Sequence, residues 1–196
     1  YSWLDLNIEY TLAIRFHGSP AGVQEQVDMV STILEENCGK DFAWSNSPED
    51  RNRLWKARHS SFYAVVSQRP NAKGWSSDVC VPVSQLSNCI LKTRELLKDC
   101  SVPAAILGHV GDGNYHVVFA VDPGNAEELG EVAAINKKMV RYALSVGGTS
   151  TGEHGVGTGK IAYLREEHGD AVELMALIKH AVDPAGIMNP GKILPN

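Results

Sequence analysis

The most informative stretch of this sequence is Gly108-His109-Val110-Gly111-Asp112-Gly113-Asn114-Tyr115-His116. An Asp-Gly pair between apolar-flanked runs is typical of a two-residue β-hairpin turn. With Asp112 and Gly113 in the turn, His109 lies directly opposite His116 on one face of the hairpin. Opposed residues of an antiparallel pair have Cβ atoms roughly 4.5–5.5 Å apart. The stretch therefore predicts a hairpin, with arms at 104–109 and 116–121, that holds two imidazoles together.

The hydrophobic pattern on either side of this hairpin predicts a mixture of strands and helices. Strands are predicted at 8–17, 41–45 and 75–81, where apolar residues alternate or run together. Helices are predicted at 20–38, 47–62, 82–99, 125–146, 160–168 and 169–182. Ser19 with Pro20 favours entry into the first helix, and Gly39 favours its end. A glycine-rich loop is expected at 147–159 and no regular structure at 183–196. This order predicts an α+β fold, a ferredoxin-like antiparallel sheet covered by helices, with a helical C-terminal extension.

The composition is that of an ordinary globular protein. The chain has 196 residues, of which 43% are hydrophobic and 21% charged, with a formal net charge of −5. An acidic balance offers no basic surface for nucleic acid, and no apolar run approaches the roughly 18 residues that span a bilayer. Four cysteines without a framework spacing favour free thiols. Because the chain begins at Tyr1 without a targeting segment, we expect a processed protein or a piece of a longer one.

The two histidines of the hairpin have the chemistry of metal ligands. Imidazole suits Zn²⁺ and other transition metals, and Glu153 in the distant stretch Gly152-Glu153-His154-Gly155 offers a carboxylate as a third ligand. Two His and one Glu, without a nearby cysteine, are typical of an open site that binds substrate. His154 is then placed to act as a base. The alternative is a hairpin with two half-exposed histidines and no metal.

Other charged and glycine-rich features point less directly to a site. Arg58 and Lys73 are candidates for binding a substrate carboxylate, although each residue taken alone is better interpreted as a solvated surface charge. The stretch 155–160 is similar to a phosphate-binding loop, but that motif needs Gly at 154 and Ser or Thr at 161. The chain has His154 and Ile161 at those positions, so the motif fails.

Several motifs together resemble those of one protein family. They are Leu54-Trp55-Lys56-Ala57-Arg58-His59, Asp78-Val79-Cys80-Val81-Pro82, the histidine hairpin, Gly152-Glu153-His154-Gly155-Val156-Gly157 and Asn189-Pro190-Gly191-Lys192. This set resembles the C-terminal domain of flavin-dependent D-2-hydroxy acid dehydrogenases of the vanillyl-alcohol-oxidase type. Within that family it is most similar to the cytochrome-linked mitochondrial D-lactate dehydrogenases. The resemblance implies that residues 1–196 are one cap domain, which binds substrate and metal, and that an FAD-binding domain precedes Tyr1.

The resemblance also implies roles for individual residues of the hairpin and of the Glu-His motif. His109, His116 and Glu153 match the ligands of a divalent metal, Zn or Mn. His154 matches the catalytic base.

Further residues are implied to contact substrate and flavin. Arg58 matches an arginine that binds the substrate carboxylate, and Lys73 is near the position of a substrate lysine, although its spacing to Asp78 differs from that in the hydroxyglutarate relatives. Asn189 and Lys192 match a terminal turn that approaches the FAD. Val118 stands where relatives that act on hydroxyglutarate have asparagine, which favours a smaller or more apolar substrate.

The implied activity is oxidation of a small D-2-hydroxy acid, above all D-lactate, to the 2-oxo acid. The implied partners are that substrate, the protein's own FAD domain and an electron acceptor such as cytochrome c, in mitochondria. The fragment alone is expected to be inactive without the FAD domain. Two alternatives remain open: a metal-dependent hydrolase, and a non-catalytic module that binds a metal or ligand.

Overall fold

A computed structural model describes residues 11–194, and the chain divides into two units, residues 1–61 and 62–196. The first unit holds helix α1 (Pro20–Glu36) and helix α2 (Pro48–His59). The predicted entry to α1 is confirmed, because the Ser19 hydroxyl accepts a hydrogen bond from the Gly22 N–H at 3.2 Å. Such a cap satisfies one of the amides that a helix leaves unpaired at its first turn.

Two strands predicted in the first unit are wrong. Residues 11–17 and 41–45 form no strand, and residues 8–10 lie outside the described part of the chain. Alternating apolar residues do not make a strand unless another backbone pairs with them, and no described strand pairs with either segment. The end of α1 also differs from the prediction, because Cys38 rather than Gly39 takes the left-handed conformation, with φ 59°.

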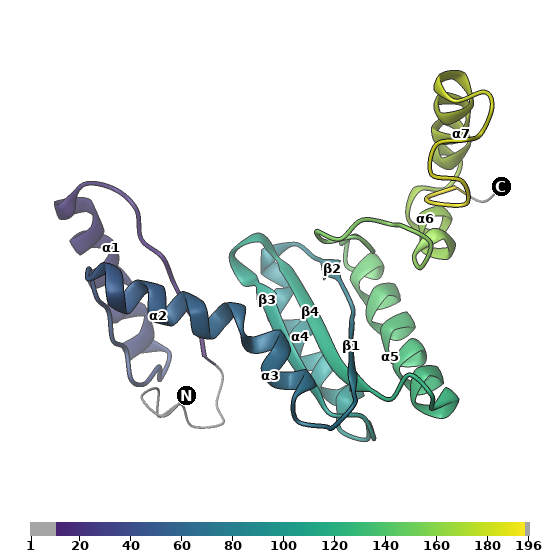
Figure 1. The fold of residues 1–196 in the computed structure, drawn as a ribbon. Coiled ribbons are helices and arrows are strands. Elements are labelled where there is room, and N and C mark those ends of the chain that lie inside the picture. The colour runs from purple at the N-terminus through teal and green to yellow at the C-terminus, as the bar shows by residue number, and fades with distance from the viewer. Residues whose placement is uncertain (1–10, 195–196) are drawn as a thin grey trace. The chain divides into compact units, whose positions relative to one another are not determined.

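The second unit is built on an antiparallel sheet around one central strand (Figure 1). Its strands are β1 (Lys73–Ser76), β2 (Val79–Cys80), β3 (Ala104–His109) and β4 (Asn114–Val121). Strand β4 pairs with β3, and it also pairs with β1 through residues 118–121 and with β2 through residues 114–115. The predicted α+β class with an antiparallel sheet is therefore confirmed.

The strand predicted at 75–81 is interrupted at Ser77 and Asp78, which are both buried. The Ser77 hydroxyl accepts a hydrogen bond from the Val117 N–H at 2.7 Å, and the Ser77 N–H donates to the Val117 carbonyl at 3.0 Å. Ser77 thus keeps this segment attached to β4 while regular pairing stops. The interruption leaves the Asp78 side chain on the sheet, close to the hairpin.

The hairpin forms, but its predicted register is wrong. Strand β3 ends at His109, which pairs with Asn114, whereas His116 pairs with Leu107. A two-residue type I′ turn requires positive φ at both central residues, and only Gly113 has one, at 78°. The connection is instead the 3₁₀ turn η1 (Val110–Asp112), closed by Gly113. His109 and His116 are therefore not directly opposite, although their ring centroids are only 6.5 Å apart.

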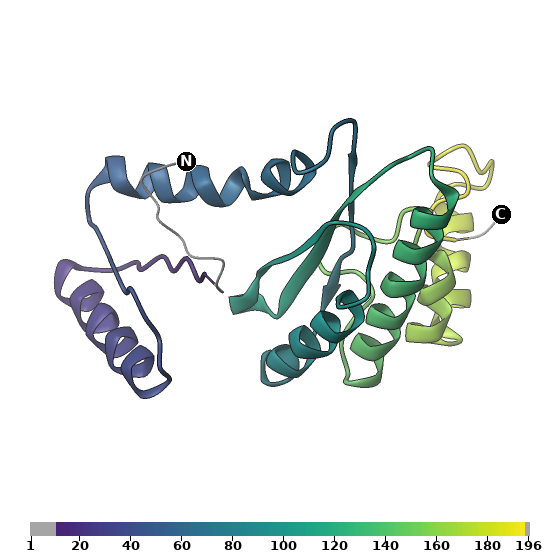
Figure 2. The ribbon, with the colours of Figure 1, turned by 90° about the horizontal axis from the view of Figure 1, so that it is seen from below.

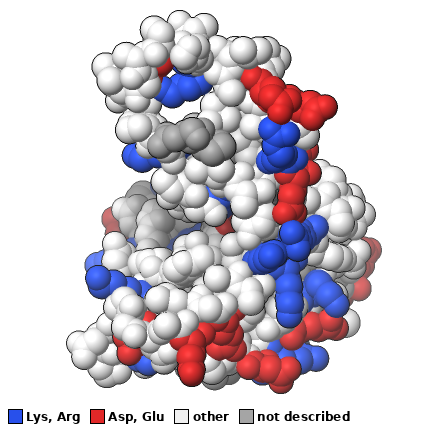
Figure 3. Space-filling model, turned by 90° about the vertical axis from the view of Figure 1, so that its right-hand side faces the viewer, with Lys and Arg blue, Asp and Glu red and all other residues white. Residues whose placement is uncertain are grey.

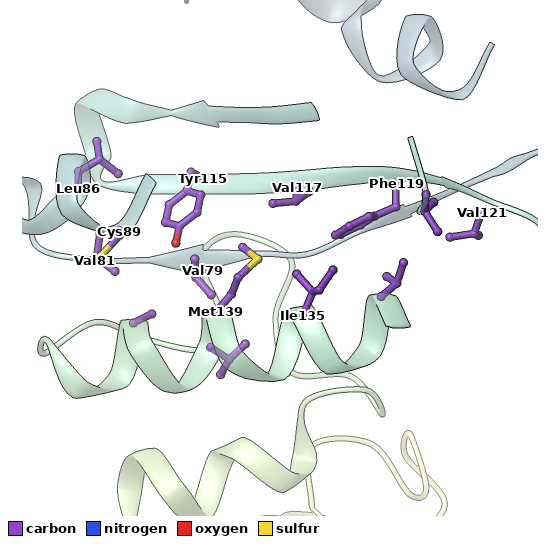
Figure 4. Close-up of a cluster of buried hydrophobic side chains, with 14 residues drawn as sticks. Val79, Val81, Leu86, Cys89, Tyr115, Val117, Phe119, Val121, Ile135 and Met139 are labelled. Carbon is purple, nitrogen blue, oxygen red and sulfur yellow. The ribbon is translucent and has the colours of Figure 1, made fainter. Parts of the chain in front are cut away.

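The hydrophobic core lies between one face of the sheet and helices α4 (Val83–Leu97) and α5 (Ala126–Ser145). Alternate side chains of β4 enter it, and Figure 4 shows them facing residues of α5 such as Ile135 and Met139. Figure 2 shows α4 and α5 side by side. Each fully buried large apolar side chain stabilises the fold by about 1.5–3 kcal/mol. This packing fixes β4, which carries His116.

Three further helices complete the second unit. Helix α3 (Ser61–Val66) precedes the sheet, and α6 (Ile161–His168) and α7 (Ala171–Val182) follow the predicted glycine-rich loop. Exposed ion pairs join Arg141 to Glu166 at 2.9 Å and Arg165 to Glu173 at 2.6 Å.

Acidic and basic side chains are interspersed on the face that Figure 3 shows. Over residues 11–194, no helix is both long and apolar enough to cross a membrane. All four cysteines are free thiols, as predicted.

Candidate metal and substrate site

Three imidazoles surround one carboxylate oxygen at the turn end of the hairpin. The Oε1 atom of Glu153 lies 2.9 Å from the Nε2 atom of His116. The same oxygen lies 3.8 Å from Nε2 of His109 and 3.7 Å from Nε2 of His154. The structure thus brings together the four residues that the sequence singled out in two separate motifs.

The loop that carries Glu153 and His154 is tied to the sheet before it reaches the hairpin. Thr149 pairs with Cys80, the last residue of β2, and the Thr149 N–H donates to the Cys80 carbonyl at 2.8 Å. Ser150 donates its N–H and its hydroxyl to the Glu167 carboxylate of α6, at 2.9 and 2.7 Å. These anchors direct the following residues toward His116.

Asp78, to which the sequence motifs assign no role, lies beneath this loop. Its two carboxylate oxygens each accept from the Glu153 N–H at 3.2 Å, and Oδ2 accepts from the His154 N–H at 3.1 Å. Asn114 donates to Oδ1 at 2.9 Å, and the Lys160 ammonium donates to Oδ2 at 3.0 Å. The main chain of the Glu-His motif therefore rests on one buried carboxylate.

The charge of Asp78 is stabilised in spite of its burial. Burial alone would raise the pKa of this carboxyl, but hydrogen bonds from Lys160, from the His154 backbone and from Asn114 outweigh it and hold the pKa at about 2. Asp78 is thus ionised at neutral pH and can only accept hydrogen bonds.

The surroundings of His116 define the roles of its two ring nitrogens. Nδ1 faces two acceptors, the Ser77 carbonyl at 3.2 Å and Asp78 Oδ1 at 3.4 Å. A proton on Nδ1 satisfies this arrangement, and it leaves the Nε2 lone pair directed at Glu153. Metal-binding histidines typically donate their second ring nitrogen to a carboxylate or a backbone carbonyl in this way.

The donor atoms fit a divalent cation. Ligands about 2.1 Å from a tetrahedral ion are about 3.4 Å from one another, and the spacings around Glu153 Oε1 are 2.9–3.8 Å. Asp78, His116 and His154 also offer ligand atoms within 4.8 Å of one another. We favour Glu153 over Asp78 as the carboxylate ligand, because hydrogen bonds from the loop, Asn114 and Lys160 already occupy the Asp78 oxygens.

Exposure differs sharply between the members of this cluster. The His116 side chain is 9% exposed, whereas those of Glu153, His109 and His154 are 47%, 55% and 62% exposed. The cluster thus has one buried histidine at its base and three exposed side chains that a small molecule can approach.

The two predicted substrate residues lie in different units of the chain. Lys73 is exposed and pairs with Val121, five residues along β4 from His116, which places its backbone about 17 Å away. Arg58 lies in the last turn of α2, in the first unit. Its role in binding substrate stays a prediction.

The predicted flavin residues lie in the segment after α7. Asn189 and Lys192 line an open hollow of about 300 Å³ together with Lys179, His180 and Asp183. Asp183 shapes the segment by accepting hydrogen bonds from the N–H groups of Ile187, at 3.1 Å, and Met188, at 2.9 Å. The Ile193 N–H donates to the Gly157 carbonyl at 2.7 Å, which ties this end to the glycine-rich loop.

Comparison with known proteins gives a consistent family. A family model described as "FAD linked oxidases, C-terminal domain" matches residues 2–193. A probable mitochondrial D-lactate dehydrogenase of Danio rerio is 46% identical over 94% of this chain and 37% of its own length. A mitochondrial D-lactate dehydrogenase [cytochrome] of Arabidopsis thaliana is 40% identical over 94% of this chain and 33% of its own length.

A solved structure is similar in fold. The 4-ethylphenol oxidase of Gulosibacter chungangensis, in complex with isoeugenol, superposes with a TM-score of 0.62 at 18% identity. The match covers 92% of this chain and 38% of that one. The chain thus spans little more than a third of the length of the proteins that it matches.

Proposed function

Because this chain belongs to the FAD-linked oxidases as their C-terminal domain, we propose that it forms the substrate-binding part of a flavin-dependent dehydrogenase. The substrate is a small D-2-hydroxy acid, D-lactate before others, and the product is the 2-oxo acid. The names of the relatives from Danio rerio and Arabidopsis thaliana support this choice. Both names support a mitochondrial location. The name of the Arabidopsis thaliana relative, which includes the word cytochrome, supports an electron acceptor such as cytochrome c.

One observation carries the proposal: three imidazole nitrogens lie within 3.8 Å of a single oxygen of Glu153. His109, His116 and Glu153 would hold a divalent ion, and their nitrogen and oxygen donors suit Zn²⁺ or Mn²⁺. When bound, such an ion supplies Lewis acidity to the substrate hydroxyl. FAD, held mainly by the N-terminal domain of the whole protein, supplies the acceptor for the hydride of the substrate C2.

His154 is the base of the proposed reaction. Its backbone N–H is fixed on Asp78 at 3.1 Å, while its side chain is 62% exposed and beside the ligands. The ring can therefore meet a substrate whose hydroxyl points at the cluster. Nε2 of His154 accepts the hydroxyl proton, and a base placed in this way contributes typically 10²–10⁴-fold to the rate.

The proposed substrate carboxylate needs a cation away from the base. Arg58 is proposed for this role because its guanidinium can bind a carboxylate through two hydrogen bonds. Asn189 and Lys192 are proposed to contact the flavin, since both line the hollow after α7.

The test uses the full-length protein, with its metal content measured by elemental analysis and its flavin followed by absorbance. We expect about one divalent ion per chain, an oxidised flavin spectrum and bleaching of that spectrum by D-lactate under anaerobic conditions. L-Lactate serves as the matched control and should leave the flavin oxidised. A protein without flavin that hydrolyses esters would instead support a metal-dependent hydrolase.

A further inference from the structure

The buried carboxylate of Asp78 touches both halves of the candidate site, yet the proposed reaction assigns it no step. We propose that Asp78 is a positioning residue, which holds the Glu153-His154 main chain and the His116 ring in the mutual geometry that the metal and the base require. This inference rests on the proposed function and adds a residue to it.

The first support is the contact between Asp78 and the loop. The side chain of Asp78 is 2% exposed, and its oxygens accept from the consecutive N–H groups of Glu153 and His154 at 3.1–3.2 Å. Two consecutive amides on one carboxylate fix the direction of the chain at that point. The Glu153 and His154 side chains consequently leave the loop from a defined place.

The second support is the contact between the same carboxylate and the hairpin. Asp78 Oδ1 lies 3.4 Å from Nδ1 of His116, on the ring edge opposite the nitrogen that faces Glu153. A carboxylate behind a ligand histidine orients the ring and raises its basicity, and loss of such a partner typically weakens metal binding 10–100-fold. Asp78 therefore acts on two ligands and on the base at once.

The third support is independent of hydrogen bonding. A Cβ atom placed on Gly152 would lie 2.4 Å from Asp78 Oδ1 and 1.8 Å from the Asn114 side-chain nitrogen. Only glycine at position 152 allows the loop to come this close to the carboxylate. The backbone is thus built for direct contact with Asp78, at the residue before the proposed ligand.

Lys160 supplies the compensating charge. Its ammonium donates to Asp78 Oδ2 at 3.0 Å and to the Asp78 backbone carbonyl at 2.9 Å. Removing Asp78 alone would leave this largely buried ammonium without its ion pair, and the protein could lose stability for that reason only. The pair must therefore be changed together in a test of positioning.

The experiment compares Asp78→Asn/Lys160→Met with Glu167→Gln in the full-length protein with its flavin. Glu167 anchors the same loop through Ser150 and is not placed at the ligands, so its variant reports the effect of a loosened loop. The readouts are the thermal unfolding curve, Co²⁺ affinity by equilibrium dialysis, the visible absorption of bound Co²⁺, and kcat and KM for D-lactate. The Co²⁺ spectrum reports ligand geometry and would not respond to a purely structural change elsewhere.

We expect the double variant to fold, to bind Co²⁺ 10–100-fold more weakly with an altered spectrum, and to lose at least tenfold in kcat at saturating metal. Glu167→Gln should lower the unfolding temperature but keep the Co²⁺ affinity and kcat within about threefold of the wild type. A folded double variant with wild-type affinity and kcat would overturn the positioning role. Equal losses in Glu167→Gln would overturn it too.

Should the double variant not fold, Asp78→Glu takes its place, because it keeps the charge for Lys160 but moves the carboxylate by one methylene. The same losses are expected, and wild-type values would again overturn the role. Wild-type protein that binds Co²⁺ and reduces its flavin, beside unaffected variants, removes only this inference. Wild-type protein that does neither removes the proposed function and this inference with it.

Discussion

The Nε2 atom of His116 lies 2.9 Å from Oε1 of Glu153. Nδ1 of the same ring faces two acceptors, at 3.2 and 3.4 Å, so a proton on Nδ1 leaves Nε2 and the carboxylate oxygen as two neighbouring atoms with unshared electron pairs. Two electron-rich atoms at this distance repel each other unless a positive charge lies between or beside them. A divalent cation satisfies this contact and also uses the nearby His109.

This relationship predicts that removal of metal destabilises the domain. A ligand present at 100 times its Kd stabilises a folded protein by about 2.7 kcal/mol. Dialysis of the full-length protein against a chelator should therefore lower the unfolding temperature of this domain by about 5 °C or more, and Zn²⁺ should restore it. Glu153→Gln should remove the response, whereas Glu167→Gln, which keeps all the ligands, should retain it. A Glu153→Gln protein that responds as strongly as the wild type would contradict the ligand set.

The second prediction separates the base from the ligands. His154→Ala should lower kcat for D-lactate by about 10²–10⁴-fold while the metal content stays at the wild-type value. The reason is that the ring of His154 is exposed and is not one of the three proposed ligands. His17→Ala, at an exposed histidine of the first unit, is the control and should change neither quantity. Retained turnover, measured by flavin reduction, would remove His154 from the mechanism.

The third prediction concerns the close approach at Gly152. An alanine there places Cβ 1.8 Å from a side-chain nitrogen of Asn114, so the loop or the hairpin must move. We expect Gly152→Ala to lower the free energy of unfolding by about 1–3 kcal/mol and to weaken metal binding. Gly159→Ala, in the same loop but with nothing within 4 Å of its Cβ, is the matched control. Urea unfolding and metal titration of both variants provide the comparison, and equal behaviour of the two would refute the packing argument.

The fourth prediction is an alkaline sensitivity that arises in the core. Burial raises the pKa of Tyr115 to about 12, and its hydroxyl is 3.1 Å from that of Thr93. Above pH 10 the unfolded chain ionises this phenol while the folded chain does not, so the free energy of unfolding falls as pH rises from about 10 to 12. The loss from this group is about 1.4 kcal/mol per pH unit in that window.

Tyr115→Phe should therefore be less stable than the wild type at neutral pH, because it leaves Thr93 without its partner, yet lose less stability between pH 10 and 12. Urea unfolding at several pH values measures both effects. Tyr63→Phe, at a residue that is 72% exposed, is the control and should follow the wild type. Parallel curves for the wild type and Tyr115→Phe would show that the phenol does not stay protonated in the core.

Elements with local signals could be predicted from the sequence. Strand β3 (Ala104–His109) matches its predicted arm residue for residue, and α5 (Ala126–Ser145) lies within one residue of its predicted ends. A helix stripe and its capping residues are close together in the chain, so the sequence contains the information that defines them. Residues 11–17, which form no strand in spite of their alternating pattern, show the limit, since a strand depends on a distant backbone that no local pattern reveals.

The hairpin register could not be predicted because distant residues fix its turn. The Val81 N–H donates to the Gly113 carbonyl at 3.0 Å, and the Cys80 thiol donates to the Asp112 carbonyl at 3.2 Å. These contacts come from β2 and the residue after it, about 30 residues away in sequence. They hold the connection in a 3₁₀ turn where the dipeptide alone favours a tighter one.

The side chains that form the candidate site could be predicted from the sequence, but the buried residues that hold them in place could not. His109, His116, Glu153 and His154 carry recognisable motifs, and the structure brings them together. Asp78 begins one of the family-like motifs and Lys160 ends the stretch 155–160, but the motifs assign neither residue a role, because a single buried ion pair has no periodicity. The available signal was a carboxylate within the predicted strand 75–81, since a charge is buried only where partners surround it.

Glu153 and His154 are suspended from Asp78 by their backbone amides and not by their side chains. Every amino acid except proline offers the same amide, so the anchor is indifferent to what these two positions display. A protein designer can therefore replace both side chains with donors chosen for another ion and still keep the Asp78 contacts that hold the loop.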